Sequence, residues 1–225
     1  MIHQHELKAN DVHAYTLEML KEHLKIKVDG YICKTDMILN VLIKASAENS
    51  SLEAACGDLE ETADSNTIRE YLNEALPIKE LREQEKQVNK VLACGTPADL
   101  VRTDIEVALD FHDEPFYGKQ AGTRQVTCAG QAKKGTTHFV RIATAYIIWR
   151  QVRLTLAVRY VLPEDETLEI LKFLLQRLKK LGFKAKVLYM DKGFASTSII
   201  QYLTAQRQPA IIACPIRGKK GGTRA

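Results

Sequence analysis

The sequence predicts an α/β protein in which a helical N-terminal domain precedes a domain built on a mixed β-sheet. Three observations lead to this fold class. Apolar residues between residues 12 and 92 recur at spacings of three and four, which is the helical period. Two runs rich in β-formers follow in residues 139–160, and after Pro163 a leucine-striped helix leads into a buried strand. Strands and helices therefore alternate only in the second half.

The first half is expected to form five helices and to end at a glycine and proline junction, Gly95-Thr96-Pro97. This junction predicts two domains, residues 1–95 and residues 96–225. The helices are expected at Val12–Leu24, from Thr35 or Asp36 onward, at Ser50–Leu59, at Thr67–Leu76 and at Ile78–Leu92.

The third and fourth of these helices are joined by a short turn and resemble a helix-turn-helix motif. In that interpretation the fourth helix reads a major groove and Arg69 is its basic side chain. However, Met1 to Glu106 holds 12 lysines and arginines against 20 aspartates and glutamates, which leaves few cations for phosphate contacts. A small packing or dimerisation bundle is therefore an equal alternative.

The second domain opens with an apolar run, Val107-Ala-Leu-Asp110, that delivers Asp110 to an expected strand end. Asp113, Glu114 and Pro115 then indicate a loop. A basic, glycine-rich segment from Gly118 to Thr137 is expected to continue it, either as a solvated connection or as a loop that lies along nucleic acid. The lysines of this segment that we consider for DNA contact are Lys119, Lys133 and Lys134.

The rest of the second domain has a clear strand and helix pattern. Phe139–Trp149 and Arg153–Tyr160 are expected to pair as an antiparallel hairpin, with Leu154, Leu156, Val158 and Tyr160 on one face. A helix with acidic residues in its first turn is expected after Pro163, and it is expected to end at Gly182. A buried strand then ends at Asp191, and a helix through Leu203 and a short strand at 210–214 follow.

Composition limits the class of protein. The 225 residues carry a net charge of +4, and Val107 to Ala225 holds 20 lysines and arginines against 8 acids. So basic a half indicates a polyanionic partner or, as the alternative, a basic surface without a specific partner. No apolar run approaches the roughly 20 residues that span a bilayer, and no signal peptide is recognisable. We therefore expect a cytoplasmic protein without membrane association, whose five cysteines are buried free thiols.

The order strand, strand, strand, helix, strand, helix, strand, with acids ending the first and fourth strands, is that of a ribonuclease H-like domain. These two strands lie side by side in such a sheet, so Asp110 and Asp191 are expected to meet. Paired carboxylates hold Mg²⁺ or Mn²⁺ through hard oxygen ligands. Two such metals would clamp the attacking and leaving oxygens of an in-line phosphoryl transfer.

Several segments resemble the transposases of bacterial and archaeal insertion sequences that have an Asp-Asp-Glu (DDE) active site. The similar segments are Ala108-Leu-Asp110 followed by Pro115-Phe-Tyr-Gly-Lys119, then Gly135-Thr-Thr-His-Phe139 leading into Ala143-Thr-Ala-Tyr146, then Arg153-Leu-Thr-Leu-Ala-Val158, and Asp191-Lys-Gly-Phe194. The resemblance covers about Ile105 to Thr223 and, more loosely, the N-terminal helices.

The resemblance implies that Asp110 and Asp191 are the first two catalytic acids and that DNA strands are cut and joined. The partners would be double-stranded DNA, both transposon ends and target, with a homodimer in the DNA complex and a nucleoid-associated location. Lys192 would contact the scissile strand. Arg217, Lys219 and Lys220 would belong to a DNA-facing surface, or alternatively to a disordered cut end.

One feature departs from the family pattern: no Glu or Asp follows Asp191 in the sequence, whereas the family places its third acid on a later helix. We therefore expect a form cut off before its last catalytic element, with little or no strand transfer. The alternatives are a DNA-binding or transposase-binding fragment that acts as an inhibitor, and another ribonuclease H-like nuclease.

Overall fold

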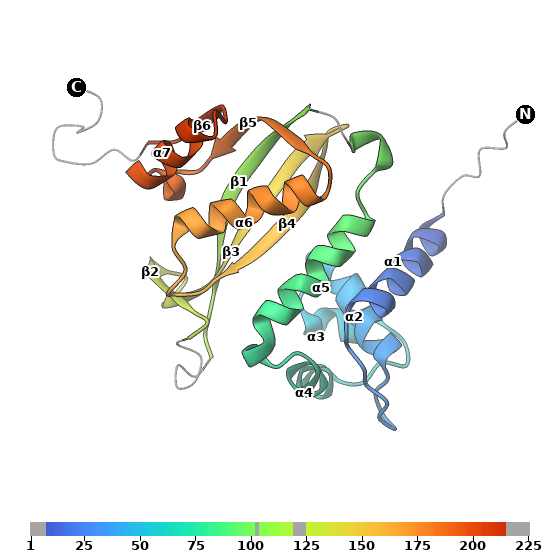
Figure 1. The fold of residues 1–225 in the computed structure, drawn as a ribbon. Helices are drawn as coiled ribbons and strands as arrows, with labels where there is room; N and C mark the ends of the chain where they lie inside the picture. Colours follow the sequence, from blue (N-terminus) through green and yellow to red (C-terminus); the bar gives the residue numbers. More distant parts are fainter. Residues whose placement is uncertain (1–7, 102–103, 119–124, 215–225) are drawn as a thin grey trace, which may run out of the picture. The chain divides into compact units, whose positions relative to one another are not determined.

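The computed structural model describes residues 8–101, 104–118 and 125–214, and these form two compact units that divide between Cys94 and Gly95 (Figure 1). Each unit is described by itself. None of the helices in the described ranges is long and apolar enough to cross a membrane.

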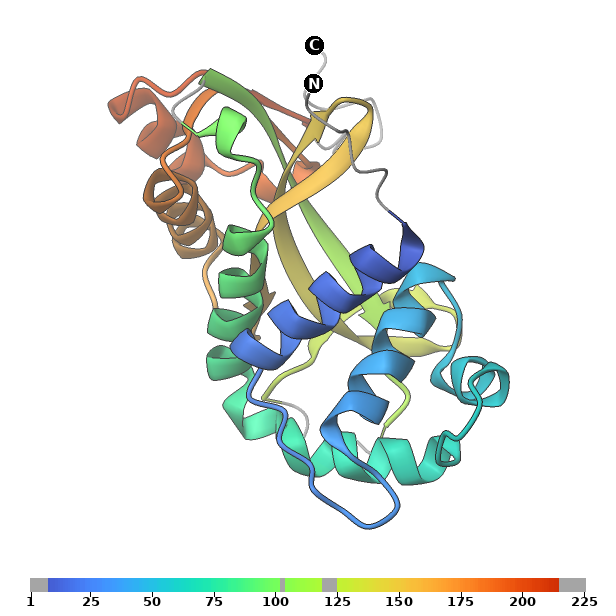
Figure 2. The same ribbon diagram turned by 90° about the vertical axis from the view of Figure 1, so that its right-hand side faces the viewer.

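The first unit is helical, as expected. It contains α1 (Ala9–His23), α2 (Thr35–Ala47), α3 (Leu52–Asp58), α4 (Ser65–Ala75), the 3-10 turn η1 (Ile78–Glu80) and α5 (Leu81–Cys94). Helix α1 packs against both α2 and α5, and Figure 2 shows α1 and α2 next to each other. The core is made of apolar side chains from α2, α3 and α4, with Ile38, Leu39 and Ile68 fully buried.

The second unit is a six-stranded mixed sheet with two helices. After the 3-10 turn η2 (Ala98–Leu100), its elements are β1 (Asp104–Pro115), β2 (Cys128–Lys133), β3 (Thr136–Trp149), β4 (Val152–Val161), α6 (Thr167–Lys180), β5 (Lys184–Met190), the 3-10 turn η3 (Lys192–Phe194), α7 (Thr197–Ala205) and β6 (Ala210–Ile212).

Strand pairing confirms the ribonuclease H-like order. Strand β3 lies antiparallel to β1 along one edge, and its other edge is shared by β2 and β4. Strands β5 and β6 extend the sheet on the far side of β1, both in parallel pairing. Helix α6 connects β4 to β5 and crosses one face of the sheet (Figure 1). The long crossover is what allows β5 to lie parallel to β1.

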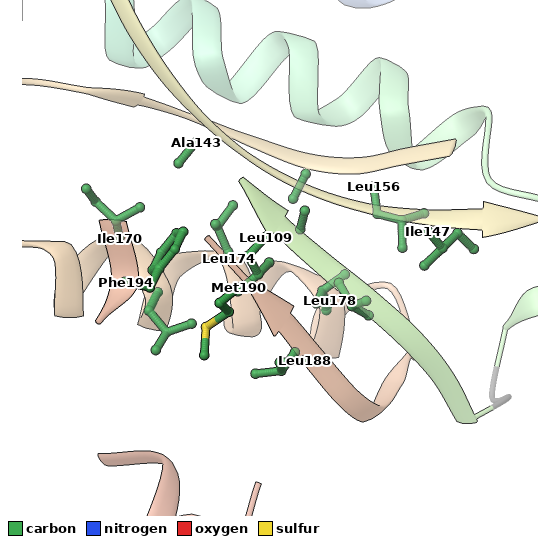
Figure 3. Close-up of a cluster of buried hydrophobic side chains, with 14 of the residues drawn as sticks. Leu109, Ala143, Ile147, Leu156, Ile170, Leu174, Leu178, Leu188, Met190 and Phe194 are labelled. Atoms are coloured by element: carbon green, nitrogen blue, oxygen red, sulfur yellow. The ribbon is translucent and has the colours of Figure 1, made fainter. Parts of the chain in front are cut away.

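The core of this unit lies between the sheet and α6 (Figure 3). Leu109 of β1, Leu188 of β5 and Leu174 of α6 are almost completely removed from solvent. Because side chains alternate across a strand, burial of Leu109 and Leu188 on the α6 face places their neighbours on the opposite face. We call the side of the sheet that carries α6 the helix face and the other side the open face.

Three details of the expected hairpin and loops are wrong. Strand β1 continues to Pro115, so Asp110 lies inside a strand and not at its end. Antiparallel pairing with β3 keeps the later residues extended, down to Pro115 opposite Phe139. Part of the expected basic loop is the strand β2, which turns into β3 through Lys134 and Gly135, both with positive φ.

The third error concerns β4, which carries a bulge. Ala145 pairs with Ala157 but Tyr146 pairs with Thr155, so Leu156 is skipped in the ladder. The bulge shifts the alternation by one residue. Leu154, Leu156, Val158 and Tyr160 therefore do not share one face; instead, Arg153 and Thr155 lie on the open face together with Val158 and Tyr160.

The five cysteines are free thiols, and Cys33 and Cys128 are buried as expected. The expectation is wrong for Cys94 and Cys214, which are exposed, and Cys56 is half-buried.

Candidate active site

Asp110 and Asp191 lie side by side on neighbouring parallel strands. Leu109 of β1 is paired with Met190 of β5, and the backbone N–H of Asp191 donates to the carbonyl of Leu109 at 3.3 Å. Both aspartates directly follow these paired residues, whose side chains are buried on the helix face. Alternation therefore sends the Cβ atom of Asp110 toward the open face, whereas Asp191 lies just past the end of β5, where it begins the η3 turn. The chain separates them by 81 positions, but the sheet makes them neighbours.

The carboxylate of Asp110 has no partner among the residues that the structure describes. The residue is half-buried in the middle of β1, and among the described residues it makes no hydrogen bond and no ion pair. Asp113, three residues along the same strand, is by contrast held by Arg141 through two hydrogen bonds of 2.6 and 2.9 Å. A partly desolvated carboxylate without a partner is costly, and a bound cation would offset that cost.

Asp191 is held in place by the turn that it begins. It precedes η3, and its Oδ1 accepts a hydrogen bond from the backbone N–H of Lys192 at 2.5 Å. No other hydrogen bond or ion pair of this carboxylate exists within the described ranges, so Oδ2 remains available as a ligand. Its orientation is thus set by a local contact that leaves one oxygen for metal or substrate.

The pair fits Mg²⁺ or Mn²⁺ by donor chemistry. Carboxylate oxygens are the ligands that these hard cations prefer, and Mg²⁺ usually combines one or two carboxylates with water and substrate phosphates. No cluster of three or more His, Cys, Asp or Glu residues that could bind a metal occurs in the part of the chain that the structure describes. If such an ion binds here, Asp110 and Asp191 would be its protein ligands.

An aromatic contact next to this pair joins β1 to the η3 turn. The ring of Phe111, the residue after Asp110, stacks on the ring of Phe194 with centroids 4.4 Å apart. Gly193 lies against the same ring: a Cβ atom on it would come within 2.7 Å of Phe111 Cδ2. The glycine is thus required by the close approach of Phe111. This contact gives a physical reason for the Asp-Lys-Gly-Phe order after β5.

On the helix face, a hollow of about 640 Å³ borders Asp191, with Lys192 and Gly193 also on its edge. Its wall includes the Arg141–Asp113 ion pair, and hydrogen bonding to Asp113 raises the pKa of the Arg141 guanidinium. Burial raises the pKa of the Cys128 thiol in the same wall. Both shifts keep these groups in their ordinary protonation states, so neither is poised as an acid or base near neutral pH.

The structure separates the residues considered for DNA contact. Lys192 is exposed and lies beside the aspartate pair. Lys133 and Lys134 are exposed in the β2–β3 turn, where the Lys134 carbonyl accepts a hydrogen bond from the Tyr117 hydroxyl. Arg69 is exposed on α4 and donates to the side chains of Ser65 and Asn66. Lys119, Arg217, Lys219 and Lys220 lie outside the described residues. Contact with DNA stays a prediction for all of them.

Sequence reasoning missed a cation on the open face, Arg153. Its guanidinium lies 3.7 Å from the ring centroid of Tyr146 and donates to Thr144 Oγ1 at 3.4 Å. Thr144 is the cross-strand partner of Asp110. From the sequence, alternation along β3 places Thr144 and Tyr146 on one face. The face of Arg153 could not be predicted in this way, because the bulge in β4 shifts the alternation by one residue.

No protein-family model matches the sequence, and no curated protein matches it. Two solved structures that show a weak structural likeness to the chain are transposase complexes. The cryo-EM structure of the piggyBac transposase synaptic complex with hairpin DNA is 11% identical, with a TM-score of 0.44 over 96% of this chain and 43% of that chain. The Drosophila P element transposase strand transfer complex is 9% identical, with a TM-score of 0.42 over 92% of this chain and 48% of that chain. The chain thus spans less than half the length of either.

Proposed function

We propose that the chain is a transposase-type DNA-processing protein of an insertion sequence, which binds double-stranded DNA and acts on its phosphodiester backbone at Asp110 and Asp191. The observation that carries this proposal is the unpartnered Asp110 carboxylate beside Asp191 on the central parallel strands of a ribonuclease H-like sheet. The resemblance of four sequence segments to DDE transposases supports the same assignment.

Each residue near the pair has a distinct part in this proposal. Asp110 and Asp191 offer carboxylate oxygens to Mg²⁺ or Mn²⁺, which when bound would polarise the scissile phosphate and activate the attacking oxygen. The Phe111–Phe194 stack and Gly193 fix the spacing between the two acid-bearing strands. Lys192, exposed next to Asp191, neutralises phosphate charge.

A second candidate function is DNA binding without efficient cutting. Asp110 and Asp191 follow paired residues of neighbouring strands, and no group of three or more His, Cys, Asp or Glu residues that could bind a metal occurs among the described residues. Two protein ligands orient a metal ion less firmly than three, and phosphoryl transfer depends on positioning and electrostatic stabilisation. We therefore expect strand cleavage by these 225 residues to be slow. A protein that occupies transposon ends and cuts poorly would inhibit a fully active transposase.

The test uses the purified chain, a plasmid that carries the flanking transposon ends, and Mg²⁺ or Mn²⁺. We expect DNA binding, and slow nicking in Mn²⁺ that Asp110→Asn and Asp191→Asn both abolish. Asp99→Asn is the matched control, because Asp99 is an exposed acid of the same unit whose partner is Arg150. Binding with no nicking supports the second candidate. Nicking that survives both active-site substitutions, or no DNA binding at all, would refute the proposal.

A further inference from the structure

The open face carries one arginine that is held in place although no acid pairs with it. Arg153 extends from β4 across β3, with its guanidinium over the Tyr146 ring and its Nη2 at 3.4 Å from Thr144 Oγ1. Among the described residues it makes no ion pair. A guanidinium presents five donors, and these two contacts leave most of them unused. The group is therefore oriented but still able to bind an anion.

The other arginines of the sheet differ in this respect. Arg141 is bound by Asp113 on the helix face. Arg159 lies over the Phe173 ring, near Asp165 at 3.8 Å. Arg150 lies over the Trp149 ring at the end of the β3–β4 hairpin and pairs with Asp99. Arg153 is the arginine of this group whose charge no described carboxylate balances.

Its place on the sheet brings Arg153 toward the aspartate pair. Thr144, which it contacts, is directly opposite Asp110 in the β1–β3 ladder. Cross-strand neighbours on one face have Cβ atoms about 5 Å apart. The guanidinium therefore lies next to the residue directly opposite Asp110, on the face toward which Asp110 projects.

We propose that Arg153 binds the non-bridging oxygens of a phosphate in the DNA strand that occupies the Asp110–Asp191 site. This inference rests on the function proposed above. A cation here would offset repulsion between phosphate and nearby carboxylates, since Glu106 and Asp110 lie on this face and Asp191 follows Met190, the β5 residue paired with Leu109. Planar guanidinium donors match phosphate geometry, and stacking on Tyr146 reduces the conformational entropy that binding would cost. The Arg153–Tyr146–Thr144 group is thus a prearranged phosphate contact.

The test measures the affinity of the whole chain for a fluorescein-labelled duplex in EDTA, by fluorescence anisotropy over a range of salt concentrations. We expect Arg153→Gln to weaken binding about fivefold to tenfold and to reduce the slope of log K against log salt by about one. Arg153→Lys should recover the slope but only part of the affinity, because an ammonium cannot bind phosphate in the bidentate manner. Arg150→Gln, also an arginine stacked on an aromatic ring, should leave both quantities almost unchanged.

A double-mutant cycle locates the phosphate. If Arg153 and Asp110 face the same phosphate, Asp110→Asn and Arg153→Gln will have non-additive effects on DNA affinity, whereas Asp110→Asn and Arg150→Gln will be additive. Three results would overturn this inference alone, provided that the wild-type chain binds DNA. They are an unchanged DNA affinity of Arg153→Gln, equal losses of affinity in Arg150→Gln and Arg153→Gln, and additive effects of Asp110→Asn and Arg153→Gln. Failure of the wild-type chain to bind DNA would overturn the proposed function as well. To show that the Arg153→Gln variant is folded, its urea unfolding curve, followed by Trp149 fluorescence, should match that of the wild type.

Discussion

Replacement of Gly193 by alanine tests the contact that holds the two aspartate-bearing strands together. The added Cβ atom would lie 2.7 Å from Cδ2 and 3.0 Å from Cε2 of Phe111. Ordinary contacts of this kind are about 3.4 to 4 Å, so the ring must move by roughly 0.7 Å or more. Phe194 restricts that movement, because its fully buried ring stacks on the ring of Phe111.

Forced overpacking of a core typically costs about 1–3 kcal/mol, so we expect Gly193→Ala to lower the free energy of unfolding by about 2 kcal/mol. Gly193 does not have a positive φ, so backbone strain adds nothing. With a urea m-value of about 2 kcal/mol per molar, the midpoint should fall by about 1 M. Asp191 lies two residues away, and its displacement should also weaken metal binding.

Urea unfolding followed by Trp149 fluorescence measures this change, because Trp149 is the one tryptophan in the sequence and lies in β3. The control is Phe111→Ala, in which the clash is absent. In that background Gly193→Ala should be neutral or stabilising by up to about 1 kcal/mol, since alanine restricts the unfolded chain. Wild-type stability of Gly193→Ala, or an equal loss in both backgrounds, would show that the contact with Phe111 is not the cause.

Three further predictions concern other parts of the chain. Asp64 caps α4, and the hydrogen bond from the Thr67 hydroxyl is the largest of the interactions that lower the pKa of Asp64 below 3.8. Asp64→Ala should lower the Tm of the helical unit by roughly 2–4 °C at neutral pH. Because only the carboxylate accepts these bonds fully, circular dichroism should show that this difference in Tm disappears as the pH falls through the folded-state pKa of Asp64. Leu174→Ala removes a fully buried side chain of α6 and should cost about 2–5 kcal/mol in the Trp149 assay; a cost below about 1 kcal/mol would contradict the packing of α6. Burial raises the pKa of the Cys128 thiol, so Cys128 should react with maleimide far more slowly than exposed Cys94 and Cys214 until the protein is unfolded, as peptide mass spectrometry can measure.

Local patterns in the sequence were sufficient for much of this fold. Helix α6 follows its leucine stripe and ends before Gly182, whose φ is +83°. Helix α7 was expected through Leu203, and its cap is Ser196, which accepts a hydrogen bond from the N–H of Ile199. The pairing of β1 with β5 follows from the order of strands and helices, because a helical crossover brings the next strand back in parallel.

Features that depend on pairing partners could not be predicted in the same way. Strand β1 runs past Asp110 because β3 supplies hydrogen bonds as far as Pro115, although Asp113 and Glu114 are poor strand formers. Strand β2 forms within a basic segment for the same reason. The position of Arg153 depends on the bulge opposite Ala145 and Tyr146, which no local propensity reveals. The length of β1, the formation of β2 and the face of Arg153 therefore depend on pairing between strands and not on local sequence patterns.

The central claim is that Asp110 and Asp191 together hold a divalent metal ion, and Mn²⁺ binding measured by electron paramagnetic resonance tests it most directly. The wild-type chain should bind Mn²⁺, Asp110→Asn and Asp191→Asn should each weaken the affinity about tenfold or more, and Asp99→Asn should bind as the wild type does. Mg²⁺ should displace the Mn²⁺. Absence of Mn²⁺ binding in the wild type, or unchanged affinity in both active-site variants, would contradict the account.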